Sequence, residues 1–97
     1  MTADARQRAV RVRIRGRVQG VWYRGWTVDT ATALGLRGWV RNRTDGSVEA
    51  LLIGPPAAVE DMIERCHDGP PAARVEAVEP ESARDDGSDG FRQRPTE

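Results

Sequence analysis

Cysteine, histidine and lysine are almost missing from this sequence. Its 97 residues include one Cys and one His, Cys66 and His67, and all its 15 Lys-plus-Arg positions are Arg. A single Cys cannot form an internal disulfide, and one Cys beside one His does not supply the roughly four ligands of a zinc site. The sequence therefore predicts no metal site, and it excludes chemistry that needs a lysine amine.

Long hydrophobic runs and net charge are missing too. No stretch approaches the ~20 apolar residues that cross a membrane, and residues 1–7 lack the apolar run of a signal peptide. With 15 basic and 15 acidic residues the net charge is zero, whereas proteins that bind nucleic acid or anionic membranes usually carry a basic excess. We expect a cytoplasmic protein that binds neither. No obvious exposed apolar face is indicated, so we also expect a monomer.

Strand and helix patterns follow one another along the chain. Residues 8–17 alternate apolar and charged side chains, which predicts a strand with one buried face and one arginine face. That arginine face is either an ordinary solvated surface or a surface that attracts anions. Tyr23, Thr27 and Ala31 lie at helical spacing, and so do residues 59–66. Further strands are expected at residues 36–43, 47–53 and 74–79.

This order of elements predicts an α+β fold, a ferredoxin-like βαββαβ sandwich. We expect an antiparallel sheet of four to five strands with two helices packed on one face. The fifth strand depends on whether residues 91–94 are extended. A single domain should span residues 8–94, between a flexible N-terminus at residues 1–7 and a C-terminal tail at residues 95–97.

The loop from Gly16 to Gly20 joins the first strand to the first helix, and Arg24 follows it. Backbone N–H groups at a helix start, beside glycines that let the chain curl, suit a phosphate, and the Arg guanidinium matches two phosphate oxygens. No Ser, Thr, Asp or Asn stands at positions 18–22 to cap the helix, which leaves these donors to a ligand. By itself the spacing is more typical of a plain tight turn than of an anion site. It is neither a P-loop nor a dinucleotide fingerprint.

Two motifs give the sequence a close resemblance to the acylphosphatase family. The first is Gly16-Arg17-Val18-Gln19-Gly20-Val21-Trp22-Tyr23-Arg24, which matches Gly-x-Val-Gln-Gly-Val-x-Phe-Arg with Tyr23 in place of Phe. The second is Gly38-Trp39-Val40-Arg41-Asn42, followed by Asp45-Gly46. The resemblance covers residues 8–80. The family usually closes with a strand containing Phe-x-Ile-Arg, and this chain has Phe91-Arg92-Gln93-Arg94 at that place.

The resemblance implies hydrolysis of acyl phosphates to a carboxylate and inorganic phosphate, with no cofactor and no metal. It implies two catalytic residues: Arg24 would hold the phosphoryl oxygens and Asn42 would orient the attacking water. The phosphate-binding residues that it implies are Arg17, Val18, Gln19, Gly20 and Val21. Trp22 and Trp26 either pack at the helix edge or line the mouth of the site and meet the acyl group.

Two other functions fit the same order of elements. An RNA-binding module would need aromatic side chains on its central strands, and residues 8–17 and 47–53 have none. A non-catalytic phosphate-binding or regulatory module remains as the alternative, of the kind found at the start of hydrogenase-maturation carbamoyltransferases. Because the chain ends soon after the expected fold, we expect a free-standing enzyme.

Overall fold

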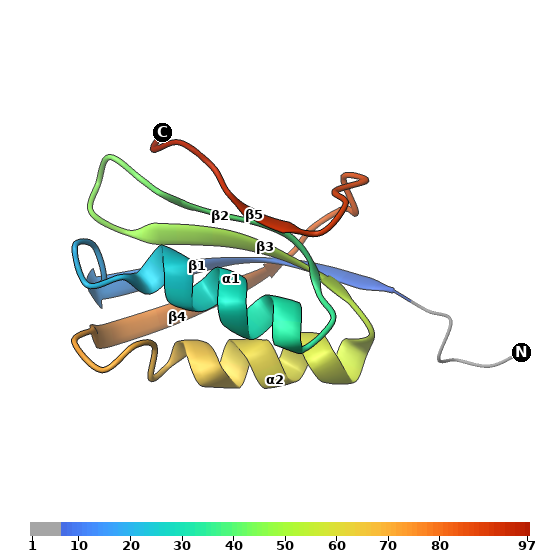
Figure 1. Ribbon diagram of the computed structural model, residues 1–97, viewed down its shortest axis with the longest axis horizontal. Helices are drawn as coiled ribbons and strands as arrows, with labels where there is room; N and C mark the ends of the chain where they lie inside the picture. Colours follow the sequence, from blue (N-terminus) through green and yellow to red (C-terminus); the bar gives the residue numbers. More distant parts are fainter. Residues whose placement is uncertain (1–6) are drawn as a thin grey trace, which may run out of the picture.

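Two helices cover one face of a five-stranded sheet in the computed structural model, which describes residues 7–97 (Figure 1). The elements are β1 (Arg8–Arg17), α1 (Tyr23–Ala33), β2 (Arg37–Asn42), β3 (Val48–Gly54), α2 (Pro56–Cys66), β4 (Arg74–Ser82) and β5 (Phe91–Gln93). The predicted α+β, ferredoxin-like arrangement is confirmed. Except for Gln7, the expected flexible N-terminus lies outside the described residues.

The strands follow the order β4-β1-β3-β2-β5 across the sheet. The prediction of an antiparallel sheet is correct for β4, β1, β3 and β2, but β5 pairs with β2 in parallel. The reason is that β4 and β5 lie at opposite edges. The chain reverses after β4 without pairing the two strands, so β5 runs in the same direction as β2. The sheet is therefore mixed.

The main core lies between the sheet and the two helices. On β1 the predicted inner face, Val10, Val12 and Ile14, is buried. The predicted helix faces are buried as well: Tyr23, Thr27 and Ala31 on α1, and Val59, Met62 and Cys66 on α2. Burying an apolar side chain of this size stabilises the fold by about 1.5–3 kcal/mol relative to leaving it exposed. Cys66 is thus a core residue, as predicted.

Two glycines shape the ends of β1 and α1. Gly16 has φ +126°, and a Cβ there would lie 2.3 Å from the carbonyl oxygen of Arg74, so only glycine lets β4 approach at this point. The β1–β4 register shifts at this residue, where the strand leads into the next loop. Gly35, at φ +74°, ends α1, and the Leu36 N–H donates to the Ala31 carbonyl at 2.9 Å. This is the predicted left-handed helix end.

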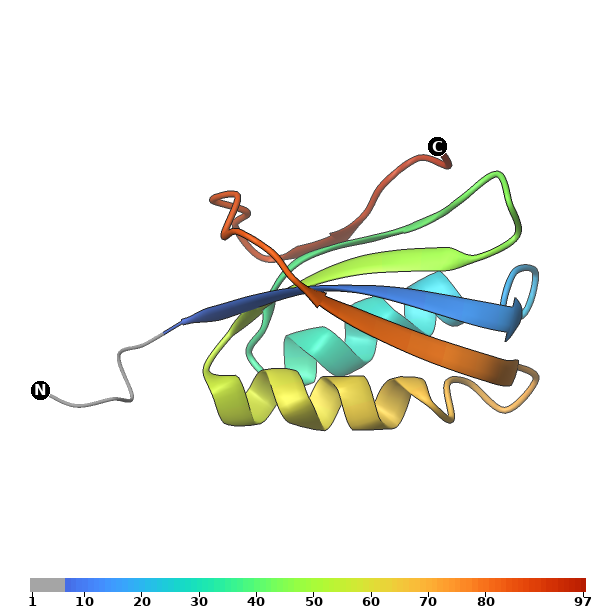
Figure 2. The ribbon, with the colours of Figure 1, turned by 180° about the vertical axis from the view of Figure 1, so that it is seen from behind.

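The C-terminal segment reaches the β2 edge of the sheet (Figure 2). Phe91 is buried in the main core, and β5 supplies the fifth strand. Beyond it, in the expected tail, the Glu97 N–H donates to the Asn42 carbonyl at 3.1 Å. No helix within residues 7–97 is long and apolar enough to cross a membrane.

Candidate active site

The β1–α1 loop and the β2–β3 loop lie at the same end of the molecule (Figure 1 and Figure 2). Gln19 joins them. Its side-chain amide Nε2 donates to the Arg43 carbonyl at 2.8 Å and to the Ser47 carbonyl at 2.9 Å. These bonds hold the loop of the first motif against the hairpin that contains the second.

The β1–α1 loop contains two residues with left-handed backbone and leads into an uncapped helix start. Val18 is buried in the main core and anchors the loop. Gly20 and Trp22 have φ of +76° and +69°, and left-handed residues help turn successive N–H groups towards one side. At the start of α1, Trp22 makes no side-chain cap hydrogen bond and the first turn holds no acidic residue. The first N–H groups of the helix therefore offer an anion both donors and the positive end of the helix dipole.

Arg24 and Asn42 line one small hollow of about 120 Å³ at this end of the molecule. Arg24 lies in the first turn of α1, and Asn42 is the last residue of β2. Both are partly exposed, and Arg24 forms no ion pair with a carboxylate of residues 7–97. Its charge is therefore available to a ligand. The lining residues are Val18, Gly20, Trp22, Tyr23, Arg24, Gly25, Asn42 and Gln93.

The hollow includes only part of the set expected to bind phosphate. Val18 and Gly20 line it, but Arg17, Gln19 and Val21 do not. Arg17 is exposed at the end of β1, the Gln19 amide binds the hairpin carbonyls, and Val21 packs against the core. The side chains of Gln19 and Val21 are used elsewhere, so any phosphate contact at these two positions would come from their backbone.

Three lining residues, Tyr23, Gly25 and Gln93, were not among the expected site residues, and Trp22 was expected there only as one of two alternatives. Gly25 has no distinguishing local signal beyond being a glycine in the first turn of a helix. Gln93 reaches the hollow because β5 pairs in parallel with β2. Nothing in the local sequence around Gln93 specifies that pairing.

Arg24 is the one charged side chain that lines the hollow. The lining contains no carboxylate and no His, so these residues provide a cationic environment and no ordinary general base. Within residues 7–97 there is also no group of three or more His, Cys, Asp or Glu side chains that could hold a metal ion. The lining offers a ligand hydrogen-bond donors and the positive charge of Arg24.

Tyr23, which replaces the Phe of the first motif, has a structural role. Its hydroxyl donates to the Cys66 carbonyl at 2.6 Å, which connects the start of α1 to the end of α2. Burial raises the pKa of this phenol far above its ordinary value. The hydroxyl therefore stays protonated and takes no part in acid–base chemistry near neutral pH.

Comparison with known proteins agrees with these features. The profile of the Acylphosphatase family matches residues 10–93. The chain belongs to the acylphosphatase family. An acylphosphatase from Rhodospirillum rubrum is 62% identical over 87 residues, which cover 88% of this chain and 93% of that protein. The predicted family and enzyme class, a hydrolase acting on acid anhydrides, are confirmed.

Solved structures of the acylphosphatase family share the fold. An acylphosphatase from Coxiella burnetii superimposes with a TM-score of 0.90 and 33% identity, covering 97% of this chain and 100% of that one. An acylphosphatase from Bacillus subtilis gives a TM-score of 0.85 and 34% identity, covering 91% and 98%. The family relationship supports acyl phosphate hydrolysis as the reaction.

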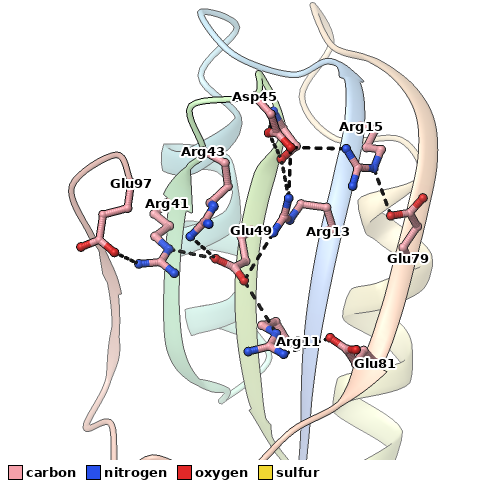
Figure 3. Close-up of polar contacts among 11 residues, drawn as sticks. Arg11, Arg13, Arg15, Arg41, Arg43, Asp45, Glu49, Glu79, Glu81 and Glu97 are labelled. Atoms are coloured by element: carbon pink, nitrogen blue, oxygen red, sulfur yellow. Dashed lines mark hydrogen bonds and ion pairs between the residues drawn. The ribbon is translucent and has the colours of Figure 1, made fainter.

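The sheet face away from the helices carries a network of ion pairs, which we call the Glu49 cluster (Figure 3). The Glu49 carboxylate, 7% exposed, lies 2.9 Å from Arg41 and 3.3 Å from Arg43. It also lies 3.7 Å from Arg11 and 3.9 Å from Arg13. The remaining members pair at the edges of the cluster: Arg15, Asp45, Glu79, Glu81 and Glu97.

This cluster favours a structural role for the arginine face over attraction of anions, because its arginines are paired with carboxylates. The cluster also bears on Asn42, which lies between Arg41 and Arg43. Successive side chains of a strand point to opposite faces, so arginines held on the outer face direct Asn42 towards the helix side, where the hollow lies.

Proposed function

We propose that the chain hydrolyses acyl phosphates by transferring the phosphoryl group to water, without a metal ion. The observation that carries the proposal is that Arg24 and Asn42, from separate elements, line one hollow at the uncapped start of α1. The family relationship supports the same reaction. The small-molecule acyl phosphate would be the substrate, and inorganic phosphate and a carboxylate the products.

The phosphoryl group would be held by the Arg24 guanidinium and by backbone N–H groups of residues 17–21 and of the start of α1. The phosphoryl transition state spreads negative charge over three equatorial oxygens, and its catalysis depends mostly on positioning and charge stabilisation. A planar guanidinium can donate two parallel hydrogen bonds to two such oxygens. The cationic lining of the hollow suits this task.

The attacking water would be oriented by the Asn42 side-chain amide. The oxygen of this water forms a bond to phosphorus while the bond between phosphorus and the acyl oxygen breaks. The carboxylate leaves with the electron pair of the broken bond. The proton of the water passes to a phosphate oxygen. A carboxylate is a good leaving group and needs no general acid, so the absence of a carboxylate or His from the lining is consistent with this route.

Hydrolysis of benzoyl phosphate, with and without EDTA, tests the proposal. We expect the wild-type protein to release benzoate and inorganic phosphate in equal amounts, at a rate that EDTA leaves unchanged, and we expect Arg24→Ala to be inactive. Loss of activity in EDTA would contradict the metal-free route. Phosphate binding without turnover would identify a non-catalytic module instead. The cytoplasmic location, the monomeric state and the absence of nucleic-acid binding stay predictions.

A further inference from the structure

The rim of the hollow carries an exposed indole. Trp22 is 62% exposed, and it is the one large hydrophobic side chain within residues 7–97 that is exposed to this degree. It lines the same hollow as Arg24 and Asn42. A large aromatic side chain left in water at the edge of a polar site presents apolar area that a ligand can cover.

The backbone of Trp22 is in an unfavourable conformation. Its φ of 69° and ψ of 24° are left-handed, and it is the one residue other than glycine with positive φ in the described chain. A bulky side chain is uncommon in this region, because its Cβ approaches the neighbouring carbonyl oxygen. Strain of this kind at a functional site persists where the surrounding structure holds the residue in place.

The indole ring of Trp22 packs against Gly25. A Cβ added to Gly25 would lie 2.1 Å from Nε1 of Trp22 and 2.5 Å from its Cε2. The ring therefore rests directly on the backbone of the first turn of α1, in space that any larger residue would occupy. Because Gly25 also lines the hollow, the ring is held beside the cavity instead of extending freely into solvent.

We propose that Trp22 is a specificity-determining platform for the acyl part of the substrate, and that it favours acyl phosphates with a planar apolar acyl group. This inference rests on the proposed function. The anionic end of the substrate would be held by Arg24 and the loop amides, so the acyl group must extend towards the open rim. An uncharged indole can cover a flat apolar group there by stacking, and it would gain little from a small acyl group.

Trp26 provides the contrast on the same helix. Its ring packs edge-on against Tyr23 with centroids 5.3 Å apart, and it is partly buried against the main core. It does not line the hollow. Trp26 therefore has a packing role, and a variant at this position is a matched control for loss of an indole.

The experiment compares kcat/KM for benzoyl phosphate with kcat/KM for acetyl phosphate in the same preparations. Trp22→Gly removes the ring and keeps a residue that tolerates the left-handed backbone. We expect the benzoyl-to-acetyl ratio to fall about 2- to 10-fold, which is the change in kcat/KM that the loss of one aromatic pair typically causes. Trp22→Phe should restore much of the ratio, and Trp26→Phe should leave it at the wild-type value.

Gly25→Ala provides a second test that keeps the indole. The added Cβ would displace the ring, which can move because it is the exposed end of a side chain. We expect the benzoyl-to-acetyl ratio of kcat/KM to fall as in Trp22→Gly. This fall would not come from a weakened helix, because Ala favours a helix more than Gly does. Circular dichroism checks the fold of each variant, and the inhibition constant of inorganic phosphate monitors the anion end separately.

Two results would overturn the inference, and they have different consequences for the proposed function. If the wild-type protein turns over both substrates and Trp22→Gly keeps the same ratio, the platform is wrong while the proposed function stands. If the wild-type protein turns over neither substrate, the proposed function fails and the platform fails with it.

Discussion

Arg24 lies at the hollow with no carboxylate partner among residues 7–97, so its charge is directed to whatever the hollow binds. We expect Arg24→Ala to lower kcat/KM for benzoyl phosphate by at least ~10²–10³-fold, the typical cost of losing one transition-state contact. Arg24→Lys should recover little, because an ammonium cannot make two parallel bonds to phosphate oxygens. Steady-state kinetics and competition by inorganic phosphate measure both effects. Near-normal activity of the Lys variant would show that only a point charge is needed.

Asn42 is predicted to act on water and not on phosphate. Asn42→Ala should therefore lower kcat by about 10²-fold while the inhibition constant of inorganic phosphate changes little. Thr44→Ala, in the adjacent exposed loop, is a control that should keep both constants. If Asn42→Ala weakens phosphate binding as strongly as Arg24→Ala does, the two residues do not divide the work in this way.

At the scale of an element, the turn between β2 and β3 depends on one carboxylate. Asp45 accepts hydrogen bonds from the Ser47 hydroxyl at 2.6 Å and from the Ser47 N–H at 2.9 Å. These bonds, with Arg13 and Arg15 nearby, lower the pKa of Asp45 from 3.8 to about 2. A pKa that is lower in the folded state adds stability above the ordinary value, and this stability is lost as pH falls towards the folded value.

We therefore expect Asp45→Asn to reduce the free energy of unfolding near neutral pH, and the difference from wild type to shrink between pH ~4 and pH ~2. Urea unfolding of both proteins across this range measures it. Asp61→Asn is a matched control, since its carboxylate makes one exposed i, i+4 pair with Arg65. A difference that stays constant down to pH ~2 would mean that the charge of Asp45 does not stabilise the turn.

The Glu49 cluster stabilises the outer face of the sheet, and its contribution can be measured. Glu49 is almost buried and contacts four arginines, so Glu49→Gln leaves several cations without their shared partner. We expect a loss of about 2 kcal/mol in unfolding free energy, below the usual cost of breaking a buried pair because the arginines are partly exposed. Glu81→Gln breaks only one exposed pair, with Arg11, and should cost less than ~0.5 kcal/mol. Equal small effects from both variants would contradict a central role for Glu49.

Local patterns predicted the elements well, and long-range pairing explains what they missed. The alternation in β1 and the helical spacing in α1 and α2 were sufficient, because each reports a buried face directly. The parallel β5 and the position of Gln93 could not be read locally, since both depend on which edge of the sheet the chain reaches. The Glu49 cluster likewise depends on the β2–β3 register. Arg24 and Asn42 were predicted as site residues from the resemblance of two motifs taken together, because loop spacing alone fits a plain turn, and their catalytic roles stay predictions.

At the scale of the whole molecule, Cys66 can report on unfolding. It is the free cysteine of the described chain and is fully buried between α2 and the sheet. Burial raises the pKa of its thiol to about 11, so little thiolate exists near neutral pH. We expect a thiol reagent to modify the native protein at least ~10³-fold more slowly than the unfolded protein, because reaction requires opening of the core.

Mass spectrometry of timed labelling, in increasing urea, checks this expectation. The labelling rate should follow the global unfolding transition seen by circular dichroism. Tyr23→Phe removes the hydrogen bond to the Cys66 carbonyl and should speed labelling. Rapid modification without urea would show that the end of α2 opens independently of the rest of the fold.

The two edge strands determine how readily the folded sheet can pair with another chain. β4 carries Pro80, which lacks an N–H donor, and the charged side chains of Glu76, Glu79 and Glu81. At the opposite edge, β5 has only three residues. Proline, charge and short length are the features that prevent an open sheet edge from recruiting a strand of another chain. The folded sheet therefore offers the strands of other chains little free edge with which to pair.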